Sequence, residues 1–342
     1  MRIRALVVRI VLQFLHDKRS LALMFIAPLM ILLLMSLIFN GETYSPKLGT
    51  YRVPAPFAAA LEDQGAELNE FETLRDGESA LEDGKIDALI AFEEGSAPAV
   101  TLEGSDPSVS RAVLVLLQSA VKSIVPSSAP EPAVRYLHGS PDMSAFDSFG
   151  PVLVGLFSFF FVFLLSGIAF LRERTGGTLE RLLASPIRRT EVVAGYLIGF
   201  GLFAILQSAL VAWFAIDILD MMSVGPFWLV MLVTLILALT ALTLGTLLSA
   251  YAANEFQMVQ FIPLVIVPQV FFSGLFNLDT VADWLRPVSY AMPLYYGADA
   301  LQGVMVRGEG MSDIAVDLYV LLGLSVVFAA LNVVALRKHR KL

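Results

Sequence analysis

Long apolar runs alternate with short polar segments along most of the chain. A helix of about 20 apolar residues crosses the hydrocarbon core of a bilayer, and it satisfies its own backbone hydrogen bonds there. Six runs reach this length: 21–39, 152–171, 192–216, 227–250, 259–276 and 314–336. The pattern predicts an α-helical polytopic membrane protein with six transmembrane helices. Composition agrees, because 57% of the 342 residues are hydrophobic and only 16% are charged, which is unusual for a soluble globular protein.

The N-terminal segment 1–20 has a different pattern, in which basic residues alternate with apolar ones. Its apolar residues recur at helical spacing: Ile3, Leu6, Val7, Ile10, Val11 and Phe14. This spacing predicts an amphipathic helix that lies on the inner membrane surface. The run 21–39 that follows could be the core of a signal peptide. It is longer than such cores usually are, and no small-x-small cleavage site precedes Asn40, so we expect a retained anchor.

Basic residues near the span ends predict the orientation. The first twenty residues carry five of them, the segment 172–191 carries five arginines, and the tail 337–342 carries four more. With six spans these three segments lie on one side, whereas Asp217 and Asp220 lie on the other side without a basic neighbour. We therefore expect a multi-pass protein of the cell membrane with both termini in the cytoplasm and residues 40–149 outside.

The segment 40–149 is polar enough to be soluble, with 18 acidic and 7 basic residues. Its apolar pattern predicts helices at 56–65 and 76–83, strands at IDALIAF and AVTLEG, and a longer helix that begins at Asp106-Pro107-Ser108. We expect a small α/β domain followed by the proline-rich connector 127–133. The excess of acidic residues argues against nucleic acid as a partner.

Catalytic chemistry has little support in the chain. There is no cysteine, and the three histidines are scattered, with only His138 in the segment 40–149, so no metal-ligand cluster is visible. Asp83-Gly84-Lys85 lacks the other glycine and the hydroxyl residue of a phosphate-binding loop. We expect no catalytic, cofactor or metal site, and thus a protein that does not itself hydrolyse ATP.

The segment 172–191 interrupts the apolar text with RERTGGTLERLLASPIRRTE. Gly176-Gly177 breaks the preceding span, and Leu179, Leu182 and Leu183 then share one face of a short helix. Ser185-Pro186 reads as the start of the next helix. Two interpretations stand equal at this point. The segment is either a basic loop lying on lipid headgroups or a short lever that docks its leucine face in a partner's groove.

Two stretches resemble the permeases of the ABC-2 type, the membrane subunits of ABC exporters. Residues 173–196 resemble that family's loop between the second and third spans, and residues 271–304 resemble its segment between the fifth and sixth. The pieces GKIDALIAF and TLEGSDPS resemble the subgroup that has a large extracytoplasmic domain after the first span. The resemblance implies a dimer of permeases, with a second copy or a paralogue, that is driven by separate cytoplasmic ATPase subunits binding ATP and Mg²⁺.

The resemblance also makes 172–191 the coupling helix that contacts the ATPase. The positions that match the family's motif are Glu173, Gly176, Thr178, Leu179, Glu180, Leu182, Leu183 and Pro186. In the family the segment 277–312 forms short re-entrant helices at the outer side. The implied permease region is 150–336.

The uncharged polar residues within the spans suggest a substrate path. These residues, with one proline of the fifth span, are Gln207, Gln260, Pro268 and Gln269. The alternative is a proline-kinked helix packed in the bundle. An apolar path suits a hydrophobic or amphipathic cargo such as a drug or lipid. Gly195-x-x-x-Gly199 is a common close-packing motif, possible at a dimer interface.

Two other classes of function remain open. The chain could be a membrane-anchored receptor or adhesion protein that acts through its acidic outer domain. It could also be a secondary transporter, although the span centres carry no ionisable residue, and Asp317, near a span end, is weak support.

Overall fold

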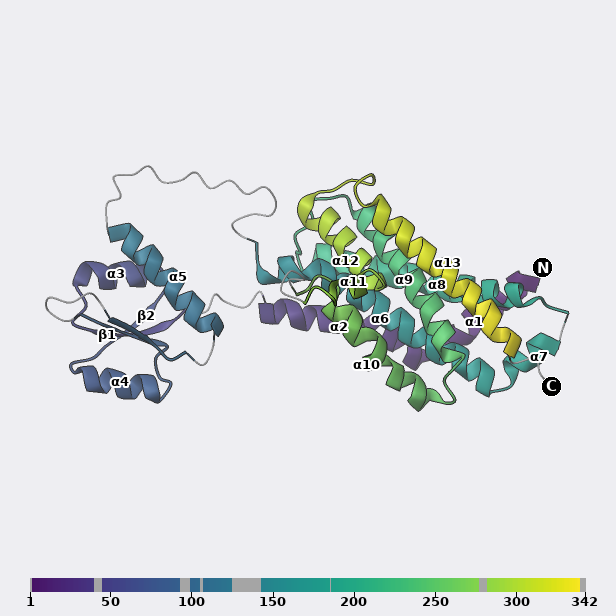
Figure 1. Ribbon diagram of the computed structural model, residues 1–342, viewed down its shortest axis with the longest axis horizontal. Coiled ribbons are helices and arrows are strands. Elements are labelled where there is room, and N and C mark those ends of the chain that lie inside the picture. Colours follow the sequence, from purple (N-terminus) through teal and green to yellow (C-terminus); the bar gives the residue numbers. More distant parts are fainter. Residues whose placement is uncertain are drawn as a thin grey trace. The chain divides into compact units, whose positions relative to one another are not determined.

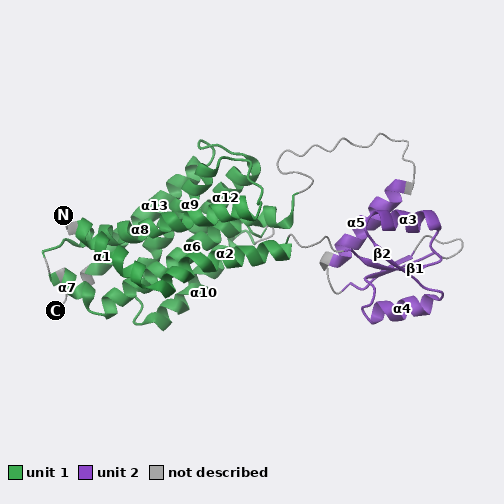
Figure 2. Ribbon diagram, turned by 180° about the vertical axis from the view of Figure 1, so that it is seen from behind, with its two compact units in different colours: residues 1–41, 136–342 green, residues 42–135 purple. Residues whose placement is uncertain are grey.

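The computed structural model describes residues 2–39, 45–92, 99–104, 107–124, 143–184, 186–276 and 282–338. The chain divides into two compact units, a helical one formed by Met1–Gly41 and Tyr136–Leu342, and a smaller one formed by Glu42–Arg135 (Figure 2). The connector 127–133 and His138 lie outside the described residues. Each unit has its own hydrophobic core and is considered separately.

Long helices account for most of the helical unit. Five of them are long and apolar enough to cross a membrane: α2 (Lys18–Phe39), α6 (Ala145–Thr175), α8 with its π-helical extension η1 (Arg189–Ile218), α9 (Phe227–Ser249) and α13 (Ala315–Lys338). They contain five of the six predicted spans. The other prediction, 259–276, overlaps α10 (Glu255–Phe271), which has only 17 residues. The described residues thus contain five helices that are candidate spans of a polytopic membrane protein, and helix length does not confirm the predicted sixth.

Helix α6 lies at the centre of this unit and packs against α2, α8, α9, α10 and α12 (Pro293–Gln302). In its most apolar window 78% of the residues are buried, compared with 22% in α2 and α13. Glycines let the backbones approach, since the nearest neighbours of Gly245 on α9 are the carbonyl group of Phe163 and the hydroxyl of Ser166 on α6. Close contact of small residues is a usual source of stability between membrane helices.

A row of hydroxyl groups joins α9 to α13. Thr240 Oγ1 and Ser325 Oγ lie 2.8 Å apart, and Asn332 Nδ2 donates to the carbonyl oxygen of Thr243 over 2.9 Å. Hydrogen bonds of this kind hold helices together where lipid offers no competing partner.

The long helices bring the chain to two opposite ends of the helical unit. The start of α1 (Arg2–His16), the short helix α7 (Thr178–Ala184) and the end of α13 lie at one end, whereas α11 (Arg286–Ser289) and α12 lie at the other (Figure 1). At that second end the backbone of the α8–α9 loop bonds to η3 (Gly303–Arg307), through Val224 N to Met305 O and Gly225 N to Val304 O. The segment 277–312 thus contains α11, α12 and η3, with 277–281 outside the described residues.

The N-terminal helix α1 is amphipathic as predicted, but its apolar face is covered by protein. Leu6, Ile10 and Phe14 are buried against α8, with Leu6 beside Gly195 and Ile10 beside Gly199. The two glycines create a shallow groove on α8 that accepts these side chains. Part of the predicted apolar face is therefore covered by α8, and the position of α1 at the inner membrane surface stays a prediction. The close-packing motif Gly195-x-x-x-Gly199 is filled by α1 of the same chain.

The smaller unit is a four-stranded sheet with helices on both faces. The strands β1 (Lys47–Tyr51), β2 (Glu67–Glu70), β3 (Ala88–Ala91) and β4 (Ala99–Leu102) lie in the order β2-β1-β3-β4. β1 is parallel to β2 and β3, and β4 is antiparallel to β3. The helices α3 (Ala55–Asp63), α4 (Leu74–Glu82) and α5 (Pro107–Ile124) match the three helices expected from the pattern. Strands β1 and β2, with the text KLGTY and ELNE, were not predicted.

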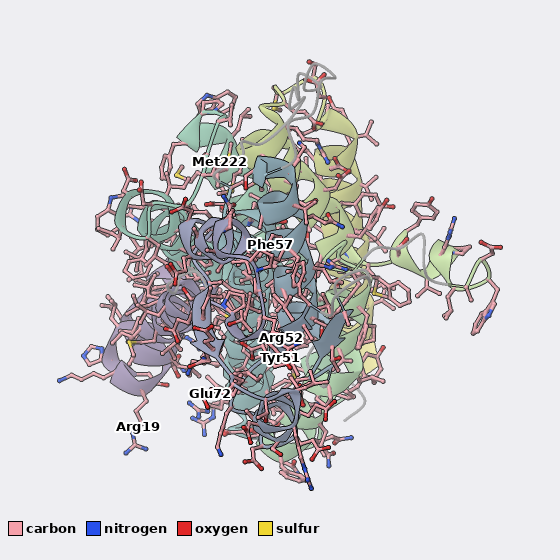
Figure 3. All side chains as sticks on the ribbon, turned by 90° about the vertical axis from the view of Figure 1, so that its left-hand side faces the viewer. Arg19, Tyr51, Arg52, Phe57, Glu72 and Met222 are labelled. Atoms are coloured by element: carbon pink, nitrogen blue, oxygen red, sulfur yellow. The ribbon has the colours of Figure 1, made fainter. Side chains whose placement is uncertain are left out.

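Side-chain alternation explains the two faces of this sheet. Leu48 and Ile90 point to the core formed with α3 and α5, whereas Leu89 points to α4. Leu89 lies directly under Gly77 of α4, where any side chain would collide with it. At the end of β1 the guanidinium of Arg52 lies 5.2 Å from the ring centre of Tyr51 (Figure 3).

Candidate functional site

A tight turn separates the end of α6 from α7. Gly176 caps α6, and its N–H donates to the carbonyl of Arg172 over 2.9 Å. Gly177 adopts φ +72°, a conformation that favours glycine, and so redirects the chain. Gly177 is therefore the residue that makes the turn.

Helix α7 has one face against the bundle and one face exposed. Leu179 is 1% exposed, and Leu182 is half-buried against the same core. Glu180, Arg181 and Ala184 are exposed. Leu179 and Leu182 of the predicted docking face anchor α7 to its own chain, so docking of that face on a partner stays a prediction. The surface open to a partner is the exposed face of α7, defined by Glu180, Arg181 and Ala184.

The remaining residues of the predicted coupling motif are placed as follows. Thr178 is half-buried at the start of α7, Pro186 is exposed just after it, and the side chain of Leu183 lies outside the described residues.

Glu173 lies on the last turn of α6 and is only 4% exposed. Its carboxylate accepts a hydrogen bond of 2.8 Å from Arg9 of α1, which also donates to the hydroxyl of Tyr196 on α8 over 3.3 Å. Glu173 thus faces the interior, away from any partner.

The two arginines that flank Glu173 also form hydrogen bonds to other parts of the helical unit. Arg172 donates to both carboxylate oxygens of Glu255, at 2.7 and 3.4 Å, and to Asp17 at 3.1 Å. Arg174 donates to the backbone carbonyl oxygens of Ala250, at 2.8 Å, and Ala252. The sequence suggested only that these arginines mark the cytoplasmic side. Their partners are distant in the sequence, so no local pattern could reveal them.

A small cavity of about 50 Å³ lies beside this cluster. It is lined by side chains of α1, the α1–α2 link, α6 and α8, among them Gln13, Asp17, Arg172, Glu173 and Tyr196. The hydroxyl of Ser20 donates to Asp17 over 2.6 Å and lowers the pKa of that carboxyl, so Asp17 stays ionised beside Arg172. Such a volume suits about one or two water molecules and not a drug-sized cargo.

The four residues proposed for a substrate path lie on two helices, α8 and α10, and differ in exposure. Gln207 is fully buried on α8, where its Nε2 donates to the carbonyl of Phe157 over 3.4 Å. Gln260 is exposed on α10, Pro268 is half-buried, and Gln269 is buried. The oxygen of Gln269 accepts the N–H of Leu294 over 2.8 Å at the start of α12. This contact favours the packed-helix alternative for α10.

Replacing Gln269 with leucine should destabilise the contact between α10 and α12. The N–H of Leu294 would lose its acceptor in a buried place, at a cost of about 1–3 kcal/mol. Thermal unfolding of the purified chain should show a lower Tm for Gln269→Leu than for the unaltered chain. Equal Tm values for the leucine variant and the unaltered chain would contradict this role.

Within the described ranges, no group of three or more His, Asp or Glu side chains is arranged to hold a metal ion. The polar cluster at the end of α6 consists of ion pairs and helix caps, without a nucleophile placed next to a base. Its geometry suits the transmission of force between helices.

Comparison with known proteins agrees with this architecture. The family model described as ABC-2 family transporter protein matches residues 18–334. The chain is 26% identical over 208 residues to ABC transporter G family member 20 of Dictyostelium discoideum, covering 60% of this chain and 28% of that protein. It is 26% identical over 171 residues to the probable multidrug ABC transporter permease YbhS of Escherichia coli, covering 49% and 45%.

A third relative is the linearmycin resistance permease protein LnrN of Bacillus subtilis, 25% identical over 185 residues, covering 53% of this chain and 48% of that protein. The matched part of the chain spans less than half the length of each of these relatives. The family model covers most of the chain. The long apolar helices of the chain are those of a multi-pass membrane protein. The chain belongs to the ABC-2 family of transporter proteins.

Proposed function

We propose that the chain is the permease subunit of an ATP-binding-cassette exporter. In this proposal a separate cytoplasmic ATPase, which binds ATP and Mg²⁺, docks on the exposed face of α7. The observation that carries the proposal is the construction of α7, whose leucine side is buried while Glu180 and Arg181 remain exposed. A short helix fixed to the bundle on one side and polar on the other is suited to receive force from a partner.

The proposed topology has six crossings, with both termini and α7 in the cytoplasm and residues 40–149 outside. The contacts of Arg172 and Arg174 support it, because they join the start of α2, the end of α6, the end of α9 and the start of α10 at one end. The α8–α9 loop and η3 meet at the other end. Helix α10 then returns the chain between the two ends, although its 17 residues make it a short crossing of about 25 Å.

The cargo of the proposed exporter is hydrophobic or amphipathic, such as a drug or a lipid. Support comes from two relatives that are named as a probable multidrug permease and a linearmycin resistance permease. The exposed apolar faces of α2 and α13 are available to membrane lipid or to a second permease copy, which completes the proposed dimer.

A charge exchange on α7 tests the ATPase contact. The double variant Glu180→Arg/Arg181→Glu should reduce the amount of co-purifying ATPase, and vanadate-sensitive ATP hydrolysis, by about tenfold, because complementary charges at an interface become repulsive. Membrane insertion and Tm should not change, since both side chains are exposed.

The control carries the same two charge changes in the smaller unit. Glu72 (Figure 3) and Arg75 are exposed there, so Glu72→Arg/Arg75→Glu should leave ATPase association intact. If the α7 variant kept its ATPase and its export activity, the docking face would be elsewhere. If the unaltered chain captured no ATPase at all, a receptor or a secondary transporter would replace the proposed function.

A further inference from the structure

Three consecutive side chains at the end of α6 hold three different parts of the helical unit. Arg172 contacts the ends of α2 and α10, Glu173 contacts α1, and Arg174 contacts the end of α9. The turn at Gly176-Gly177 and α7 follow immediately. This last turn of α6 therefore connects α7 with helices to which α7 has no direct covalent link.

Arg172 uses three of its nitrogens on two helix N-termini. Asp17 is the residue before α2, and its carboxylate accepts the N–H and the hydroxyl of Ser20. Glu255 is the first residue of α10, which follows the N-cap Asn254. A carboxylate at a helix N-terminus interacts favourably with the positive end of the helix dipole. The planar guanidinium of Arg172 lies between the two carboxylates and so joins the two helix starts in a fixed geometry.

Arg174 binds at a helix C-terminus, whereas Arg172 binds at two helix N-termini. Its Nη1 and Nη2 donate to carbonyl oxygens of Ala250 and Ala252, just after α9 ends at Ser249. Carbonyls at a helix C-terminus lack intrahelical partners, and a cation there also matches the dipole. The two arginines together hold both sides of the turn between α9 and α10.

We propose that Arg172 and Arg174 are positioning residues that carry movement of α7 to α9 and α10. The proposal rests on the function proposed above. Chain connectivity links α7 directly only to α6 and α8, and apolar packing joins the middle of α6 to its neighbours. The two arginines add polar links at the end of α6 itself, so that the α9–α10 turn follows this end as one rigid body and α6, α8, α9 and α10 move together.

The contacts of Arg172 with Glu255 and Asp17 are half exposed, so each contributes little to stability. Loss of the arginines should therefore change coupling more than folding. We expect Arg172→Gln/Arg174→Gln to retain the ATPase and its ATP hydrolysis, while cargo exported per ATP falls at least about fivefold, a usual size for coupling between sites.

A distance measurement tests the rigid connection directly, and the absence of native cysteine makes labelling specific. Spin labels at Ala184→Cys on α7 and Tyr251→Cys on the α9–α10 turn both occupy exposed positions. The chain is co-expressed with the ATPase that purifies with it, and the distance is recorded without nucleotide and after trapping with ATP and vanadate. The expected result is one narrow distance in both states for the unaltered arginines, and a shifted or broadened distance after trapping in the double Gln variant.

Arg19→Gln is the matched control. It removes an exposed arginine close to the same helix ends, and its side chain points away from the ribbon (Figure 3). If the double variant folded poorly, Arg172→Lys would replace it, because an ammonium group cannot hold the planar three-bond arrangement. An unchanged distance and unchanged export per ATP in the arginine variants would overturn the proposal. Failure of the unaltered chain to bind any ATPase would instead overturn the proposed function on which it rests.

Discussion

Replacing Gly245 with valine should destabilise the helical unit by about 3 kcal/mol or more, at the upper end of overpacking costs. Gly245 lies where α9 crosses α6, and a side chain there would collide with the backbone carbonyl of Phe163 and the hydroxyl of Ser166. A backbone group cannot rotate away as a flexible side chain can, so the two helices must separate. Because α6 is central to the unit, separation would weaken the whole core.

The measurement is the Tm of purified chain in detergent, followed by fluorescence-detected size exclusion. A loss of this size corresponds to a Tm lower by roughly 6–12 °C for a domain of 150–250 residues. Gly323→Val is the control, since Gly323 on α13 has no heavy atom within 4 Å of the added carbon. If Gly245→Val and Gly323→Val had the same Tm, close packing of α6 and α9 would not be a main source of stability.

The sequence was sufficient for the long helices, because a run of apolar residues in a membrane has almost one possible structure. The predicted span 152–171 falls inside α6, and 227–250 exceeds α9 by one residue. The helix over Thr178–Ala184 follows from its leucine spacing. The predicted span 259–276 is longer at its C-terminal end than the helix observed there, because this run contains Ser273 and Gly274. Helix α10 ends at Phe271, and Gly274 adopts φ +86°.

The sequence could not predict what covers the apolar face of each amphipathic helix, because this depends on contacts between distant segments. Periodicity correctly placed Leu179 and Leu182 on one face of α7, but it could not tell whether a partner or the chain itself covers that face. The same holds for Leu6 and Ile10 on α1. Protein and lipid are both apolar, so an amphipathic pattern alone does not distinguish them.

The candidate site shows the same limit for charged residues. Arginines near span ends were interpreted through the positive-inside rule, which concerns orientation and not pairing. Their partners Asp17 and Glu255 are separated from Arg172 by 155 and 83 residues. In the smaller unit, β1 was missed because the text KLGTY contains a glycine and lacks strong alternation. Its place between β2 and β3 provides the burial that the local sequence does not signal.

The ion pair between Arg9 and Glu173 should respond very differently to the loss of each partner. The side chain of Arg9 is 34% exposed, whereas that of Glu173 is 4% exposed. After Glu173→Leu the guanidinium of Arg9 can turn toward water. After Arg9→Met the carboxylate of Glu173 stays buried without its cation, and breaking a buried pair in this way costs about 3–5 kcal/mol.

We therefore expect Arg9→Met to lower the Tm substantially, Glu173→Leu to lower it less, and Arg9→Met/Glu173→Leu to recover most of the loss. Replacing a complete buried pair with apolar side chains is often neutral, since no charge remains to be solvated. Thermal unfolding of the four proteins forms a double-mutant cycle, and the pair should show a coupling energy of about 1–3 kcal/mol. Additive losses in the double variant, or equal losses in the single variants, would show that α1 is held to the helical unit by apolar packing of Leu6, Ile10 and Phe14 on α8 alone. A strong coupling would instead mean that α1 is fixed by charge to the turn that leads into α7, so that the N-terminal helix must move whenever α7 does.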